Sequence, residues 1–401
     1  MRTLGTLFTG GGGFECGAVA AGLTPIWGIE YDPEIASVYD RNFGPHIICA
    51  NVEDVDYARL TRPDWLHMSP VCKNASVAKK DGQEAAEDLS SAEACARAIR
   101  SLSSPFVSLE NVWGYRNFES FRIILRALEE SGYAFDYWHL NAADYGVPQT
   151  RKRLILLASK TRRPRRPKPT HAKEPPAQVD LFSPAPLLRW EGWYRAIEDL
   201  IPTLPESRFA EWQLKRLPAA LGRYLMESKF PGRNALVMYK KECEPAPTVT
   251  ALDPRMRAFI CEATAAGVDN KFTMPVRPDA EPIFTVRPEP NIPRAFILDC
   301  QDAGTPDENG ERKLTVRDGG EPTFTVSASM QRRPARAWLS CGRVVSMTPR
   351  ALARFQSIPD SYVLPEKAGL ACKLIGNAVA PLLTQRVIES VRVVNTERSA
   401  A

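Results

Sequence analysis

The sequence predicts an α/β fold built on a doubly wound, mostly parallel sheet, and three observations predict it. Over residues 1–160, short apolar runs alternate with stretches in which apolar residues recur at helical spacing. The first run ends in four consecutive glycines, which is typical of a turn between a parallel strand and a helix. Helical spacing returns near residue 350, after a proline-rich middle. Strands that alternate with helices form a sheet with helices on both faces.

The N-terminal region holds strands and helices in alternating order. Apolar runs predict strands over Thr3–Thr9, Pro25–Glu30, Trp65–Met68, Phe106–Glu110 and Leu154–Ala158. Helical spacing predicts helices over Phe14–Leu23, Pro33–Asn42, Leu89–Leu102 and Phe118–Leu128, the last with Asn117 as its N-cap. Near the C-terminus it predicts helices over Pro349–Gln356, capped by Thr348, and through Val379–Val391. We expect the first and last regions to pack together.

The middle of the chain contains a threefold repeat. Segments that begin at Glu244, Glu281 and Glu321 each have a Thr-Val pair, a turn rich in proline or arginine, and an Arg-Ala-aromatic sequence. Each copy predicts a β unit such as a hairpin, so that a small β-rich domain is inserted in the α/β fold. We place the domain boundaries at 1–160, 161–340 and 341–401. The basic, proline-rich residues 160–173 are either a solvated linker or a strap that contacts phosphates.

Composition argues against several classes of protein. Lys and Arg number 52 against 47 acids, a net charge of +5 that does not identify a nucleic-acid binder but leaves room for a local basic face. Nine cysteines without Cys-x-x-Cys spacing, and only four histidines, argue against a zinc site and a disulfide framework. We expect no metal. The N-terminus does not resemble a signal peptide and no apolar run reaches eighteen residues, so we expect a cytoplasmic protein without a membrane span.

The glycine run is a candidate cofactor site. Phe8–Gly13 follows the first predicted strand, where a ligand can approach the backbone closely. Glu30 ends the second predicted strand, and a carboxylate there can accept hydrogen bonds from both hydroxyls of a ribose. Nicotinamide-dependent oxidoreductases share these features, although their G-x-G-x-x-G pattern fits this run only loosely.

The candidate nucleophile is Cys72, which follows the strand Trp65–Met68 in the sequence Ser-Pro-Val-Cys. Active sites of α/β proteins form at the carboxyl ends of strands, and the neighbouring Lys73 favours the thiolate. The alternative interpretation is a buried structural cysteine. Three further motifs follow along the chain: Glu110-Asn111-Val112 at the end of a strand, Gln149–Arg153 with two arginines that project to the same side, and Gly376–Val379 at the start of the last predicted helix.

Taken together and in this order, these motifs resemble the cytosine-5 DNA methyltransferase family. The resemblance covers about residues 1–160 and 340–395, and Thr348–Tyr362 resembles the family's segment before its last motif. It does not extend through the middle, which in this family holds the target-recognition region. The resemblance implies a Rossmann-like, S-adenosylmethionine-dependent methyltransferase fold with the β-rich middle as the target-recognition domain. It also implies a DNA (cytosine-5-)-methyltransferase that flips cytosine out of duplex DNA.

The resemblance implies a role for each motif. Cys72 would add to carbon 6 of cytosine, Glu110 would hydrogen-bond N3 when protonated, Asn111 would orient Glu110, and Arg151 and Arg153 would face the flipped base. The implied contacts to S-adenosylmethionine are Phe8, Gly10, Gly12, Gly13, Glu30, Tyr31, Asn51, Val52, Asn377 and Val379. The implied DNA contacts are Lys73, Ser76, Gln149 and Arg333. We expect a monomer, encoded by a bacterium or phage, with double-stranded DNA and a cognate restriction endonuclease as partners.

The chain also departs from the family pattern. Val71 replaces the proline before the nucleophile, Lys73 a glutamine, and Ala75 an aromatic residue; Asn51 and Thr6 stand where acids are usual. Two alternatives therefore stay open, a catalytically weak DNA-binding regulatory homologue and an RNA cytosine-5 methyltransferase. A zinc deaminase also acts on cytosine, but its His-x-Glu and Cys-x-x-Cys ligands are absent.

Overall fold

The computed structural model describes residues 2–70, 84–175, 186–207, 295–299, 315–318, 320–326, 336–339 and 344–396. The chain divides into two compact units. The first consists of Met1–Glu191, Pro322–Gln331 and Pro349–Ala401, and the second of Gly192–Glu321 and Arg332–Thr348. The first unit extends past residue 160, where the sequence suggests a boundary, and includes the opening of the third repeat. No helix among the described residues is both long enough and apolar enough to span a membrane.

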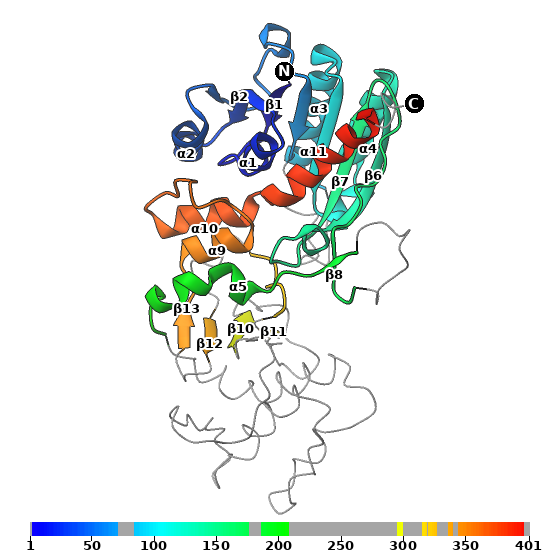
Figure 1. The fold of residues 1–401 in the computed structure, drawn as a ribbon. Coiled ribbons are helices and arrows are strands. Elements are labelled where there is room, and N and C mark those ends of the chain that lie inside the picture. Colours follow the sequence, from blue (N-terminus) through cyan, green and yellow to red (C-terminus); the bar gives the residue numbers. More distant parts are fainter. Residues whose placement is uncertain are drawn as a thin grey trace, which may run out of the picture. The chain divides into compact units, whose positions relative to one another are not determined.

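The first unit is built around a seven-stranded sheet in the order β3-β2-β1-β4-β5-β7-β6 (Figure 1). The strands are β1 (Thr3–Leu7), β2 (Thr24–Glu30), β3 (Ile47–Cys49), β4 (Trp65–Met68), β5 (Phe106–Asn111), β6 (Ala134–Asn141) and β7 (Lys152–Ser159). Neighbours from β3 to β5 pair in parallel, and β7 runs antiparallel to both β5 and β6. The predicted mostly parallel sheet is confirmed. Two strands are not predicted from the sequence: β3, which has three residues, and β6, an edge strand with half-exposed side chains.

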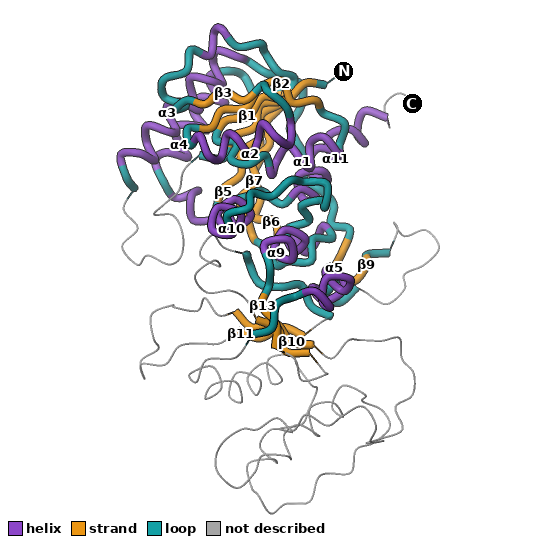
Figure 2. Tube along the Cα trace, turned by 90° about the vertical axis from the view of Figure 1, so that its left-hand side faces the viewer, coloured by secondary structure: helices purple, strands orange, loops and turns teal. Residues whose placement is uncertain are grey.

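Helices cover both faces of this sheet, as Figure 2 shows. One face carries α3 (Ala86–Leu102) and α4 (Glu119–Glu130), and the other carries α1 (Gly13–Ala20) and α11 (Pro381–Thr396). Because successive side chains of a strand point to opposite faces, Leu66 joins the first core and Trp65 the second. Burial of each such side chain contributes about 2 kcal/mol.

The helices begin where the sequence offers acceptors for their free amides. At α2 (Pro33–Phe43), the side chain of Asp32 accepts hydrogen bonds from the amides of Glu34 and Ile35, over 3.0 and 3.4 Å. The prediction that Asn117 caps α4 is wrong. The N-cap position is Phe118, and the carboxylate of Glu84 accepts from the first two amides of α4 instead. A cap that comes from 35 residues away is invisible to a local pattern.

The C-terminal part of the first unit has one helix more than the sequence analysis predicts. The helix α9 (Pro349–Phe355) matches its prediction, α10 (Ala368–Asn377) was not predicted, and α11 begins at Pro381. The motif Gly376–Val379 therefore lies at the end of α10 and in the connection to α11, not at the start of the last helix.

The described part of the second unit contains α5 (Trp193–Ile197) and a four-stranded antiparallel sheet in the order β11-β10-β12-β13. Its strands are β10 (Ala295–Asp299), β11 (Thr315–Asp318), β12 (Arg336–Leu339) and β13 (Val344–Ser346). The Arg-Ala-aromatic segments of the second and third repeats form β10 and β12. Phe296 and Trp338, the equivalent aromatic residues, are register partners, so the two strands are related by a local twofold axis.

The hairpin predicted for the third repeat is wrong. Thr323, near the beginning of this repeat, forms a bridge with Gln149 in the first unit, while the repeat's second strand β12 belongs to the second unit. The first repeat and the opening of the second lie outside the described residues.

Candidate active site

The turn between β1 and α1 has a backbone that only glycine adopts easily. Gly10 and Gly12 have φ angles of 57° and 87°, and Phe8 also has a φ of 57°. A Cβ on Gly12 would lie 2.1 Å from a ring carbon of Phe43, whereas a Cβ on Gly10 would meet nothing within 4 Å. The amide of Gly12 donates to the carbonyl oxygen of Thr9 over 3.0 Å. The turn is therefore closed towards α2 and open above Gly10, where a ligand can approach the backbone.

Glu30 lies at this turn, as the sequence predicts. Its Oε2 accepts a hydrogen bond from the amide of Gly10 over 3.1 Å, and its Oε1 accepts from the amide of Asp32 over 3.0 Å. Burial raises the pKa of this carboxyl. The adjacent Tyr31 is 67% exposed. A carboxylate beside an open glycine turn, with an exposed aromatic ring next to it, is an arrangement that can bind a nucleoside.

Asn51 and Val52 follow β3 at the same end of the sheet. The amide of Ala50 donates to the carbonyl oxygen of Glu30 over 3.0 Å, which holds this segment beside β2. Asn51 is exposed, and its Oδ1 accepts from the amide of Glu53. Val52 is buried. An exposed amide side chain and an apolar one thus adjoin Glu30.

The C-terminal motif packs against the glycine turn. A Cβ on Gly13 would lie 2.7 Å from the Cβ of Ala378 and 3.0 Å from the carbonyl oxygen of Val379. The hydroxyl of Tyr362 donates to the carbonyl oxygen of Gly11 over 2.6 Å. Asn377, at the end of α10, is exposed. Residues more than 350 positions apart in the sequence therefore form one site at this turn.

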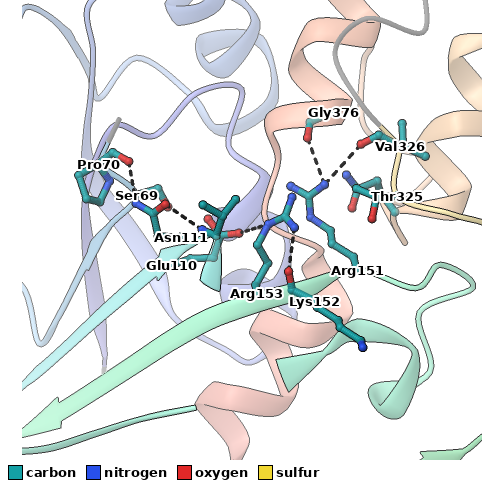
Figure 3. A network of polar contacts seen from close by, with 12 residues as sticks. Ser69, Pro70, Glu110, Asn111, Arg151, Lys152, Arg153, Thr325, Val326 and Gly376 are labelled. Atoms are coloured by element: carbon teal, nitrogen blue, oxygen red, sulfur yellow. Dashed lines mark hydrogen bonds and ion pairs between the residues drawn. The ribbon is translucent and has the colours of Figure 1, made fainter. Parts of the chain in front are cut away.

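Glu110 and Arg153 form an ion pair between β5 and β7 (Figure 3). Nε of Arg153 lies 3.0 Å from Oε1 of Glu110, and the two side chains are 16% and 8% exposed. The two strands are antiparallel neighbours, so the carboxylate at the end of β5 meets the arginine at the beginning of β7. An ion pair with this little exposure fixes the position of the carboxylate.

Asn111 holds the start of the segment that carries Cys72. Its Nδ2 donates to the carbonyl oxygen of Pro70 over 3.0 Å, and its Oδ1 accepts from the amide of Val112 over 2.8 Å. Asn111 was expected to orient Glu110, but these two hydrogen bonds go to Pro70 and Val112. Cys72 itself, with the predicted DNA contacts Lys73, Ser76 and Arg333, lies outside the described residues.

Arg151 differs from the expectation. Its NH1 donates to the carbonyl oxygens of Gly376 and Val326, over 3.1 and 3.4 Å, so that it joins the beginning of β7 to the end of α10 and to the third repeat (Figure 3). Of the two arginines expected to face the flipped base, Arg153 is the one that contacts Glu110. Gln149, predicted to contact DNA, is fully buried.

A buried histidine that the sequence does not single out, His67, lies in β4 next to Ser69. Nδ1 of His67 is 2.8 Å from the hydroxyl of Ser108, and Nε2 is 3.0 Å from the hydroxyl of Ser69. Ser108 also accepts a hydrogen bond from Nε1 of Trp65 over 2.8 Å. The ring stacks on Phe14 with centroids 3.5 Å apart, and burial lowers its pKa to about 3. In the sequence, His67 can be recognised as the one polar residue in the apolar run Trp65–Met68.

Among the described residues, no cluster of three or more His, Cys, Asp or Glu side chains could hold a metal ion. The site therefore consists of an open glycine turn with Glu30, an ion-paired Glu110, and an anchored segment that leads to Cys72.

A family model described as C-5 cytosine-specific DNA methylase matches residues 3–392. The Type II methyltransferases M1.HphI of Haemophilus parahaemolyticus and M.DdeI of Desulfomicrobium norvegicum are 23% and 25% identical to this chain. These two matches cover 97% and 96% of the chain and 86% and 87% of the relatives. M.Bsp6I of Bacillus sp., also a Type II methyltransferase, is 30% identical over 39% of the chain. The chain spans about half the length of that relative, 52%.

Solved structures show the same fold. A chain assigned as a DNA modification methyltransferase, encoded within an E. coli prophage, aligns with a TM-score of 0.55 at 15% identity, over 99% of this chain and 100% of its own. The methyltransferase EhMeth of Entamoeba histolytica aligns with a TM-score of 0.52 at 11% identity, over 98% of both chains. At these identities the likeness concerns the fold alone.

Proposed function

The chain belongs to the C-5 cytosine-specific DNA methylase family, and we propose that it transfers a methyl group to carbon 5 of cytosine in double-stranded DNA. The observation that carries the proposal is the buried Glu110–Arg153 pair, next to the asparagine that anchors the start of the Cys72 segment. A carboxyl group that can bind the base and a cysteine that can attack it are the two protein groups that the chemistry needs.

S-adenosylmethionine is the proposed cofactor, and when bound it supplies the methyl group. The residues present fit it. The backbone is open above Gly10, the carboxylate of Glu30 can accept from ribose hydroxyls, and the exposed ring of Tyr31 can lie against the adenine. The remaining proposed contacts are residues of the turn or residues near it: Phe8, Gly12, Gly13, Asn51, Val52, Asn377 and Val379.

The proposed mechanism begins with removal of the cytosine from the base stack, because its ring atoms are out of reach within the duplex. The thiolate of Cys72 adds to carbon 6, and the electron pair of the 5,6 double bond makes carbon 5 nucleophilic enough to take the methyl group. A base then removes the proton from carbon 5. The bond between carbon 6 and sulfur breaks, the double bond forms again, and the thiolate is released.

In its protonated form Glu110 would donate a hydrogen bond to N3 of the flipped base and steady the negative charge that develops there. Arg153 fixes the position of Glu110, and Asn111 fixes the start of the segment that carries the nucleophile. Arg151 is a positioning residue, since it joins the beginning of β7 to the end of α10 through two carbonyl oxygens.

The proposed substrate requires a surface that reads the DNA sequence. The second unit, with its paired repeats β10 and β12, is the proposed target-recognition domain, and Arg333 between the third repeat's two halves is a proposed phosphate or guanine contact. The Type II methyltransferases among the relatives support a restriction endonuclease of the same specificity as a functional partner.

The test is methyl transfer from labelled S-adenosylmethionine to mixed-sequence duplex DNA, followed by digestion and detection of 5-methylcytosine. We expect the label to vanish with Cys72→Ala. It should persist with the control variant Cys95→Ala, which changes a buried cysteine of α3. Label in RNA alone would move the proposal to an RNA substrate. DNA binding without label, in a folded protein, would favour the regulatory homologue and implicate Val71, Lys73 and Ala75.

A further inference from the structure

Glu15, in the first turn of α1, has a fully buried carboxylate between β1 and the glycine turn. Its Oε1 accepts a hydrogen bond from the hydroxyl of Thr6 over 2.5 Å and another from the hydroxyl of Thr9. Its Oε2 is also buried but has no hydrogen-bond partner. A buried carboxylate oxygen without a donor is costly, so its retention calls for a physical reason.

The surroundings of Glu15 contain no fixed cation among the residues that the structure describes. The ionisable groups that face it are the thiol of Cys16 on the same helix, the phenol of Tyr39 on α2 and the phenol of Tyr362 after α9. None of these groups carries a positive charge. Burial raises the pKa of Glu15 to about 6, which leaves the carboxyl ionised at neutral pH. A negative charge without a positive partner therefore lies directly behind the turn.

Thr6 occupies the position where the family usually has an acid. The carboxylate of Glu15 reaches the hydroxyl of this same residue, so α1 brings an acidic group to the place where β1 does not supply one. S-adenosylmethionine has a sulfonium and an ammonium group, both cationic. We propose that Glu15 is the counter-charge of the sulfonium and makes the turn prefer S-adenosylmethionine over the same ligand without the sulfonium charge. This inference rests on the proposed function, which names the cofactor.

The test compares the binding of S-adenosylmethionine with that of S-adenosylhomocysteine, by calorimetry on the full chain at pH 7.5 or above. The second ligand lacks the methyl group and the sulfonium charge but keeps the remaining groups. Glu15→Gln should weaken the binding of S-adenosylmethionine by about threefold to tenfold, the range for a partly screened charge pair, and that of S-adenosylhomocysteine by less than about twofold. Equal weakening of both ligands would mean that Glu15 acts on the groups that the two ligands share, such as the ammonium, or on the shape of the turn, and would overturn the inference.

Two further variants control this comparison. Glu129→Gln removes an exposed carboxylate from α4 and should leave both affinities unchanged. Adding Thr6→Asp to Glu15→Gln restores a carboxylate at the contact between these two residues and should restore the preference for S-adenosylmethionine. A folded double variant without this preference would refute the counter-charge. A wild-type chain that binds neither ligand refutes the proposed function itself, whereas wild-type binding with an unaltered preference in Glu15→Gln refutes the role of Glu15 alone.

Discussion

Replacing Arg153 by alanine should lower the free energy of unfolding by about 3 kcal/mol, because it leaves a buried carboxylate without its cation. Nε of Arg153 lies 3.0 Å from Oε1 of Glu110, and the side chains are 16% and 8% exposed. Two charges about 4 Å apart attract each other by about 4 kcal/mol at an effective dielectric constant of about 20. Because the arginine is partly exposed, water entering the space it leaves recovers part of this energy.

Urea denaturation of four proteins measures the pair: wild type, Arg153→Ala, Glu110→Gln and the double variant. Glu110→Gln removes the charge but keeps the shape, so adding Arg153→Ala to it should cost much less than the same change in the wild type. The expected coupling free energy is about 2 kcal/mol. A cost below about 1 kcal/mol for Arg153→Ala, or equal costs in the two backgrounds, would show that water rather than the arginine balances the charge of Glu110.

Glu84→Ala should lower the free energy of unfolding by about 1 kcal/mol, because its carboxylate caps α4, whereas Asn117→Ala should change it by less than about 0.3 kcal/mol; equal urea midpoints of the two variants would contradict this. Gly12→Ala should cost more than about 3 kcal/mol, because its Cβ would lie 2.1 Å from an aromatic ring of α2 at a φ of 87°, and a thermal unfolding midpoint like that of the wild type would refute it. Burial lowers the pKa of His67 from 6.5 to about 3, so below pH 6.5 the unfolded chain binds more protons at this residue than the folded one. The contribution of neutral His67 to the free energy of unfolding is complete above pH 6.5 and is lost as the pH falls towards 3, by about 5 kcal/mol in total. The free energy of unfolding of His67→Asn, measured against pH, should lack this loss. For Glu15 the sign is opposite: burial raises the pKa from 4.5 to about 6, so the folded chain binds more protons between these values. The free energy of unfolding of the wild type should fall by about 2 kcal/mol relative to Glu15→Gln as the pH rises from 4 to 7, and parallel profiles would contradict the buried charge.

The glycine turn and the strand that ends at Glu30 could be predicted from the sequence, because their signals are local. A run of glycines at the end of an apolar strand indicates a tight turn. Gly10 and Gly12 have positive φ angles, which glycine adopts more easily than other residues. The parallel pairing of β1 to β5 follows from the alternation of helical and apolar stretches, because a crossover through a helix brings the next strand back in the same direction.

Elements with weak local signals could not be predicted. The strand β3 is three residues long, and most side chains of β6, at the edge of the sheet, are half-buried or exposed, so neither shows a clear apolar run. The cap of α4 comes from Glu84, and the third repeat splits because Thr323 finds a backbone partner in Gln149. In both cases the hydrogen-bond partner is a residue far away in the sequence, although a neighbouring residue of a suitable type is also present.

By itself the sequence determined the fold class, the turn, and the residue types that the chemistry needs. The tertiary structure alone decided which of them meet: Glu110 pairs with Arg153 and not with Arg151, and Asn111 anchors Pro70. The physical reason is that charged and polar groups lose their water on burial, and each then takes whichever partner the packed strands bring within hydrogen-bonding distance. A sequence shows which groups must find partners, but only the packing of strands and helices decides which partners they find.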